Sequence, residues 1–118
     1  WKWFTGMSYI VKDLYDKDIY KNDTDLDIFH SRQDAERKLR NEKTGTYMPI
    51  LSEKCNELIV LYITQSNFDK KIYEIVMTRK QDDFDINKDR IYILNSDNKQ
   101  HKYFDYIRKN SHLKKLYS

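Results

Sequence analysis

Residues 31–52 read SRQDAERKLRNEKTGTYMPILS, and this stretch decides the fold of the chain. Ser31 can cap a helix N-terminus through its hydroxyl group, and Asp34 stands three residues later in the capping-box position. The segment 41–45 ends the helix, because Gly45 tolerates the left-handed backbone conformation in which helices often stop. Residues 47–51 then read as an apolar strand. The stretch therefore predicts a capped helix, a turn and a strand in immediate succession.

The segments on either side predict more strands and two further helices. Residues 57–64, ELIVLYIT, are apolar on both faces, which is typical of a central strand covered on each side. Residues 71–79 alternate in character and predict the next strand, and residues 90–94 predict a short one. A helix over 102–110 presents aromatic and aliphatic residues to the core, and helical spacing predicts a short helix over 9–20. We therefore predict an α+β fold, a central antiparallel sheet with a helix on each face.

Size and composition indicate one soluble domain, which we assign to residues 1–118. Hydrophobic residues make up 39% of the chain and charged residues 35%, while the net charge of +3 is too mild to demand a nucleic acid or an acidic membrane. No apolar run approaches the roughly twenty residues of a membrane-spanning helix. The lone Cys55 cannot form an internal disulfide. It favours an intracellular location, in the cytoplasm or nucleus, or in the host cytosol if the protein comes from a pathogen.

Four motifs in order resemble those of the Src-homology-two family, whose members read phosphotyrosine peptides. The family usually writes S-R-x-x-A-E-x-x-L, a short gap and G-T-F-L-V-R-x-S, and residues 31–52 are similar to this pattern. ELIVLYIT lies where the family has its strand C, and KKIYEIVMTR resembles the strand D motif V-K-H-Y-K-I-R. RIYILNSDNKQHKYFDYIRKNSHL is similar to the family's F-Y-I, loop, aromatic-led helix B and N-S-L. The resemblance covers residues 31–113 and implies that residues 9–29 are an insertion before the first family helix.

The resemblance also implies the positions of a phosphate pocket and a peptide groove. Arg32 falls on the helix A arginine that contacts the phosphate and the tyrosine ring. Ser52 falls on the strand B serine that donates to the phosphate, and Lys54 lies in the phosphate-cradling loop. Tyr73 matches the strand D tyrosine that lines the peptide groove, and Ile93 matches a strand E position near the specificity pocket.

Three departures from the family pattern remove the chemistry of that pocket. Ile50 replaces the main phosphate-binding arginine, Ile72 replaces the strand D histidine, and Glu74 replaces the strand D lysine. A phosphate dianion needs charge-assisted donors, which isoleucine lacks and a carboxylate repels. Charged hydrogen bonds contribute about 1.5–3 kcal/mol each, so losing two would weaken binding several hundredfold or more. Pro49 lies in the same strand, where its missing N–H predicts a broken ladder or a bulge.

These observations predict a non-enzymatic interaction module, such as a signalling adaptor domain within a larger protein. Its ligand would be a protein or peptide, bound without a phosphate group. One alternative is that Arg32, Ser52 and Lys54 form a rebuilt pocket that still binds phosphotyrosine. No catalytic motif, cofactor motif or metal-ligand spacing is present, so we predict no enzyme activity, no cofactor and no metal site.

Nucleic-acid binding by the C-terminal third is the alternative from a different functional class. Lysines there are interleaved with tyrosines, a composition that suits phosphate contacts and base stacking. The charge is nevertheless dilute for a nucleic-acid footprint, and a solvated helix face explains it equally well. The basic residues concerned are Lys99, His101, Lys102, Lys109, Lys114 and Lys115.

Overall fold

A computed structural model describes residues 10–11, 14, 31–54, 56–80 and 91–117. In chain order its elements are α2 (Arg32–Leu39), β1 (Thr46–Leu51), β2 (Glu57–Ser66), β3 (Asp69–Arg79), β4 (Ile91–Leu94), β5 (Gln100–Lys102), α3 (Tyr103–Lys109) and β6 (Lys115–Leu116). The fold is α+β, as the sequence predicts. Ile10, Val11 and Leu14 are helical, whereas the rest of the helix predicted over 9–20 and most of the insertion predicted over 9–29 lie outside the described residues.

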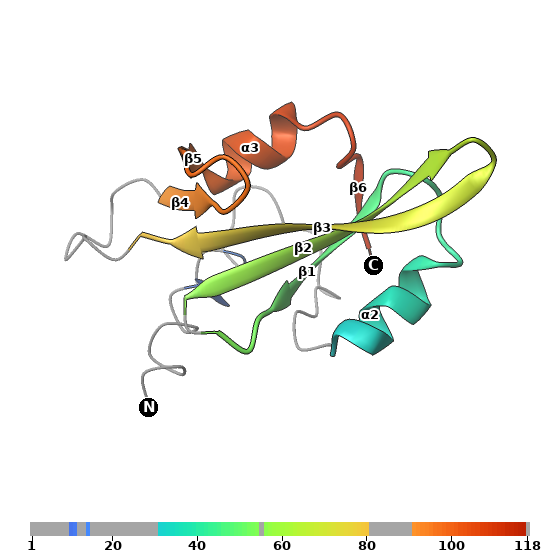
Figure 1. Cartoon of the computed structure of the whole chain (residues 1–118), viewed down its shortest axis with the longest axis horizontal. Helices are drawn as coiled ribbons and strands as arrows, with labels where there is room; N and C mark the ends of the chain where they lie inside the picture. The colour runs from blue at the N-terminus through green and yellow to red at the C-terminus, as the bar shows by residue number, and fades with distance from the viewer. Residues whose placement is uncertain (1–9, 12–13, 15–30, 55, 81–90, 118) are drawn as a thin grey trace.

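The strands form one sheet in the order β5-β4-β3-β2-β1-β6 (Figure 1). All neighbouring strands run antiparallel except β1 and β6, which pair in parallel through Thr46 with Lys115 and Tyr47 with Leu116. The predicted central antiparallel sheet is therefore confirmed, but the sheet as a whole is mixed. β6 has two residues and β5 has three. Strands this short show no alternation with a period of two, so the sequence pattern does not reveal them.

α2 and α3 lie on opposite faces of the sheet, and the side chains of the strands alternate between these faces. Tyr47, Leu58 and Val60 belong to a buried cluster that includes Tyr103 and Ile107 of α3. The residues between them belong to a second cluster under α2, which comprises Ala35, Leu39, Met48, Ile50 and Leu61. We call these sides the α3 face and the α2 face. Figure 1 looks onto β3, with α3 above the sheet and α2 below it.

Different local features define the start and the end of α2. The backbone N–H of Asp34 donates to the Ser31 hydroxyl oxygen at 3.2 Å, which confirms the predicted N-cap. The helix ends at Leu39, earlier than the predicted 41–45 stop. Gly45 instead leads the chain into β1 with φ of +99°, and its carbonyl accepts from the N–H groups of Lys114 and Lys115. A Cβ at this position would lie 3.0 Å from the side chain of Lys114, so a side chain here would be strained in backbone conformation and crowded against Lys114.

Pro49 does not break the sheet, and the predicted disruption is wrong. Met48, Pro49 and Ile50 pair with consecutive residues of β2, without a bulge. Ser52 N–H donates to the carbonyl of Glu57, so alternation places the Pro49 nitrogen on the side of β1 away from β2. Pairing with β6 stops at Tyr47, so no ladder bond is needed from residue 49.

Candidate functional site

Ile50 occupies the core beneath α2. It lies in β1 with 1% of its surface exposed and belongs to the cluster that contains Ala35, Leu39 and Leu61. The register with β2 sets this direction, because Ile50 pairs with Ile59 and Met48 pairs with Leu61 on the same face. The position that the family resemblance assigns to an arginine is therefore filled by an aliphatic side chain that packs against the helix.

Arg32 lies in the first turn of α2 and is held between two carboxylates. Its Nε donates to Oε1 of Glu36 at 3.2 Å, and its Nη1 lies 2.6 Å from Oε2 of Glu74 on β3. The hydrogen bond to Glu36 and, less strongly, the charge and hydrogen bond of Glu74 raise the pKa of Arg32 above its usual value. A phosphate approaching Arg32 would have to displace or neighbour these carboxylates, which opposes binding.

Ser52 follows β1 and is also directed to a carboxylate. Its buried hydroxyl donates to Oε1 of Glu57 at 2.8 Å and accepts the backbone N–H of Lys54 at 3.1 Å. The side chain of Lys54 is exposed in the turn between β1 and β2. Two of the three predicted phosphate donors, Arg32 and Ser52, therefore contact glutamates.

Ile72 and Glu74 both lie on the α2 face of β3. Ile72 pairs with Ile63 and packs at the margin of the cluster under α2, while Glu74 pairs with Leu61. This face thus brings together Arg32 and all three residues at which the sequence departs from the family pattern. Three of these four side chains are aliphatic or acidic. The fourth, the guanidinium of Arg32, is paired with carboxylates.

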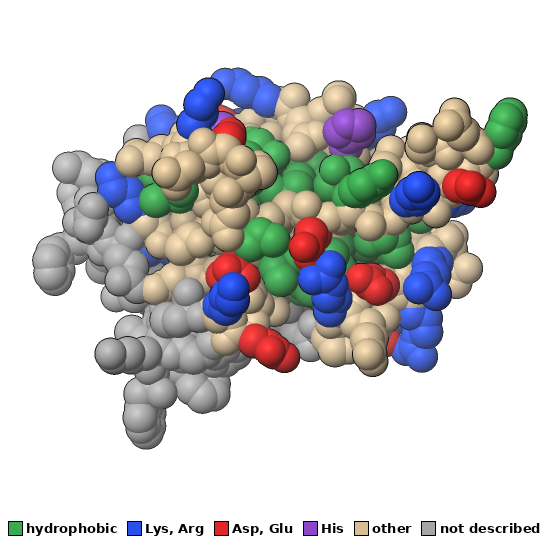
Figure 2. All heavy atoms as spheres, in the orientation of Figure 1, with side chains coloured by type: hydrophobic (Ala, Val, Ile, Leu, Met, Phe, Trp, Pro, Cys, Tyr) green, Lys and Arg blue, Asp and Glu red, His purple; other side chains and the backbone are tan. Residues whose placement is uncertain are grey.

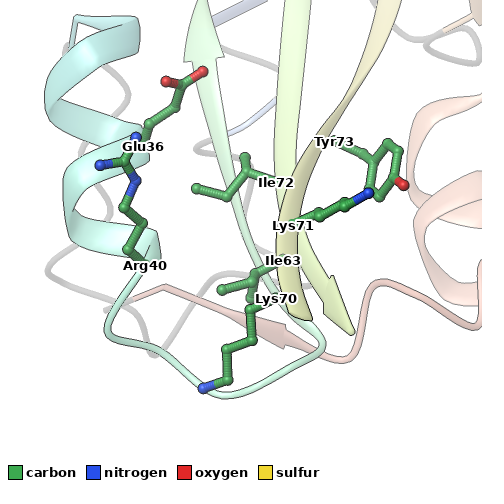
Figure 3. A pocket seen from close by; sticks show the side chains of 7 residues that line it. All are labelled: Glu36, Arg40, Ile63, Lys70, Lys71, Ile72 and Tyr73. Atoms are coloured by element: carbon green, nitrogen blue, oxygen red, sulfur yellow. The ribbon is translucent and has the colours of Figure 1, made fainter. Parts of the chain in front are cut away.

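A cavity of about 480 Å³ lies between α2 and the β2–β3 hairpin (Figure 3). Its lining comprises Glu36, Arg40, Ile63, Lys70, Lys71, Ile72 and Tyr73. In Figure 3 the side chain of Ile72 points toward the helix, whereas Lys71 and Tyr73 lie on the other side of β3. The cavity therefore reaches the edge of β3, and basic side chains outnumber acidic ones around it. No sequence pattern predicts this cavity, because it depends on the distance between α2 and the hairpin.

Tyr73 belongs to an aromatic cluster on the α3 face. Its ring stacks on Tyr62 with a centroid separation of 5.9 Å, and Tyr62 stacks in turn on His112 at 5.7 Å. Tyr106 lies nearby on α3 and meets His101 edge to face at 5.1 Å. Burial first, and then the neighbouring Tyr106 and Tyr73, raise the pKa of Tyr62 above its usual value. Tyr73 remains 45% exposed, so the cluster presents an aromatic surface to solvent.

One sequence feature, the turn between β2 and β3, predicts a partner of Tyr73. Asn67 and Phe68 both have positive φ and form a two-residue turn between β2 and β3. A two-residue turn at this point places Tyr62 opposite Tyr73, as observed. His112 reaches the cluster through the tertiary packing of the C-terminal segment, which no local pattern predicts.

Ile93, the second predicted groove residue, does not lie beside Tyr73. It pairs with Thr78, five residues further along β3, which corresponds to about 17 Å at the usual strand rise. Odd and even positions alternate, so Ile93 and Tyr73 also lie on opposite faces of the sheet. The structure therefore separates these two residues.

The C-terminal basic residues do not form one surface either. Lys99 precedes β5 and Lys102 ends it, whereas Lys114 precedes β6 and Lys115 begins it, and these strands are the opposite edges of the sheet. His101 pairs with Asp97 at 3.3 Å, and the backbone N–H of Lys99, with a smaller contribution from His101, lowers the pKa of that carboxyl. Within the described ranges, no group of three or more histidine, cysteine or carboxylate side chains could hold a metal ion. No helix in the same ranges is long and apolar enough to cross a membrane.

Comparison with known proteins finds no family model that matches this chain and no curated protein that resembles its sequence.

Proposed function

We propose that this chain is a non-enzymatic module that binds a protein or peptide, with a Src-homology-two-like fold and a phosphate pocket that has lost its main donor. It would serve as an adaptor domain within a larger intracellular protein. The observation that carries the proposal is the burial of Ile50 beneath α2, at the position where the family resemblance calls for an arginine.

The surroundings of Ile50 support a ligand without phosphate. Arg32 contacts Glu36 and Glu74, and the Ser52 hydroxyl contacts Glu57. A buried dianion in this place would meet carboxylates where it needs charge-assisted donors. Lys54 alone supplies a mobile point charge, which cannot replace the bidentate geometry of an arginine.

The aromatic cluster around Tyr73 is the surface that best suits an unphosphorylated peptide. Exposed tyrosine rings combine a large apolar area with a polar tip, and they lose little entropy on binding. Tyr73 and Tyr62 present two stacked rings, with His112 beside them. Apolar or aromatic peptide side chains would pack there. Figure 2 shows apolar side chains gathered over the middle of this view, bordered by acidic and basic ones.

Titration with a degenerate unphosphorylated peptide library, followed by NMR of the labelled protein, tests this surface. We expect resonances of Tyr62, Tyr73 and His112 to shift, and Tyr73→Ala to weaken binding by tenfold or more, about the usual loss for an aromatic anchor. Phe68→Ala is the matched control, since Phe68 is an exposed aromatic residue of the same hairpin outside the cluster. Binding that is unchanged in Tyr73→Ala, or equally weakened in Phe68→Ala, contradicts the assignment.

A further inference from the structure

Within the part of the chain that the structure describes, one edge of β3 has no partner strand over more than half of its length. β3 pairs with β2 from Asp69 to Thr78, but its pairing with β4 begins at Met77. The carbonyl of Val76 already accepts the N–H of Asn95, so the open stretch is residues 69–75. Among the described residues, none forms a ladder with this stretch, and Figure 1 shows it crossing in front of the sheet.

The backbone groups along this edge follow from the hairpin register. The two-residue turn makes Ser66 and Asp69 a hydrogen-bonded pair, so every second residue of β3 bonds to β2. Lys70, Ile72 and Glu74 are the intervening residues, and their N–H and C=O groups point away from β2. An exposed row of such groups is a template for pairing with another strand.

We propose that this edge pairs with the same edge of a second copy of the chain, as an antiparallel homodimer whose two-fold axis passes beside Ile72. Ile72 is the midpoint of the open stretch, so this register uses all of it in both copies. Ile72 then lies opposite its own copy, and Lys70 lies opposite Glu74 in both directions. The paired backbone groups of Lys70, Ile72 and Glu74 close the ladder between the copies.

The side chains favour this register over its neighbours. A two-fold at Lys71 places lysine opposite lysine, and a two-fold at Glu74 places glutamate opposite glutamate, which destabilises pairing. A two-fold at Tyr73 places Ile72 opposite Glu74 and runs one end of the ladder into β4. Only the register centred on Ile72 matches opposite charges at both ends. Glu74 would then lie between Arg32 of its own chain and Lys70 of the other copy.

The helices leave room for this arrangement. α2 packs mainly over β1 and β2, and it reaches β3 through the ion pair of Arg32 with Glu74. In a continuous sheet the two α2 helices would lie on the same face, about four strand spacings or ~19 Å apart, which exceeds a helix diameter of about 10–12 Å. On the other face, Lys71 would lie opposite Tyr73 of the second copy, where an ammonium can stack on the ring. The dimer would carry both aromatic surfaces on one face.

Analytical ultracentrifugation of the unliganded protein over a concentration series, together with a charge-swap cycle, tests this dimer. We expect reversible self-association, which Lys70→Glu or Glu74→Lys each weakens by about tenfold or more, because each change makes two cross-strand pairs repulsive. The double variant Lys70→Glu/Glu74→Lys should associate again, and an equimolar mixture of the two single variants should form a heterodimer.

Controls separate this result from a loss of fold or of net charge. Lys109→Glu changes the charge as Lys70→Glu does, but at an exposed position on α3, and should leave association unchanged. Thermal unfolding of each variant, followed by circular dichroism, verifies folding. A chain that stays monomeric at every concentration overturns the proposal. So does association that is insensitive to the two single changes, or a double variant that fails to associate while folded.

Discussion

The guanidinium of Arg32 lies 2.6 Å from the carboxylate of Glu74, and this ion pair joins α2 to β3. Both side chains are partly exposed, at 52% and 38% of their surface. The pair occupies the place in which the family resemblance would put a phosphate between a helix arginine and a strand lysine. Under that resemblance, the carboxylate of Glu74 takes the position of the ligand's charge.

Removing Arg32 should cost little stability. Exposed ion pairs contribute about 0.2–1 kcal/mol each, and those of Arg32 are with Glu36 and Glu74. We expect Arg32→Ala to lower the free energy of unfolding by about 2 kcal/mol or less in urea denaturation. A loss of several kcal/mol would mean that Arg32 contributes to the stability of the whole fold rather than only to surface ion pairs.

Introducing a charge at Ile50 should be far more costly. An arginine there would be desolvated beneath α2 beside Leu39 and Leu61, and an unpaired buried charge costs about 3–5 kcal/mol. Chemical denaturation of Ile50→Arg measures this loss, and Ile50→Val, with an expected cost of about 0.5–1.5 kcal/mol, is the control. In Ile50→Arg/Glu74→Lys, sulfate should recover part of the lost stability, since it would pair with both cations.

An Ile50→Arg variant as stable as the unchanged chain would contradict this expectation. Such a result would mean that the side chain at position 50 reaches solvent rather than the core.

A side chain at Gly45 should destabilise the protein. Its φ of +99° is unfavourable for other residues, and an added Cβ would lie 3.0 Å from Lys114. We expect Gly45→Ala to lower the free energy of unfolding by about 1–3 kcal/mol, the range for strained backbone positions. Thr44→Ala, at the exposed preceding residue, is the comparison. Equal stability of the two variants would argue against the close passage of residues 45 and 114.

Tyr62 should make the protein less stable in alkali. Its raised pKa means that the folded state holds the phenolic proton more tightly than the unfolded state does. The resulting stabilisation is present below about pH 10, the ordinary tyrosine pKa, and is lost as the pH rises through the raised value. In Tyr62→Phe, the midpoint temperature of thermal unfolding should therefore fall less steeply above about pH 10 than in the unchanged chain. A steeper decline than in the unchanged chain would reverse the sign and refute the burial of Tyr62.

The sequence predicts the local elements well where the local pattern is strong. The Ser31 cap, the strand through Ile50 and the long strand at residues 57–64 are each signalled by neighbouring residues, and all three are present. Residues on both faces of β1 are buried, so the local pattern leaves the direction of Ile50 open, and the register with β2 sets it. β6 could not be predicted, because two residues carry no period and their pairing depends on how the C-terminal segment packs.

Relationships between distant segments were the part that sequence reasoning could not supply. Tyr73 and Ile93 lie on strands that pair with each other, yet the offset between those strands separates them. That offset could not be predicted, because residues 80–90 separate the two strands in the sequence and no short hairpin turn sets their register. The contact between Arg32 and Glu74 likewise required the helix to be placed over the sheet, although the family resemblance puts both residues near the phosphate.

Paired calorimetric titrations test the central claim most directly. A degenerate phosphotyrosine peptide library and its unphosphorylated counterpart would be titrated into the unchanged chain and into Arg32→Ala. Because Ile50 is buried and Arg32 is paired with two carboxylates, we expect that phosphorylation does not strengthen binding. We also expect Arg32→Ala to bind both libraries with the same affinity as the unchanged chain. Micromolar binding that requires the phosphate group and disappears in Arg32→Ala would contradict the account.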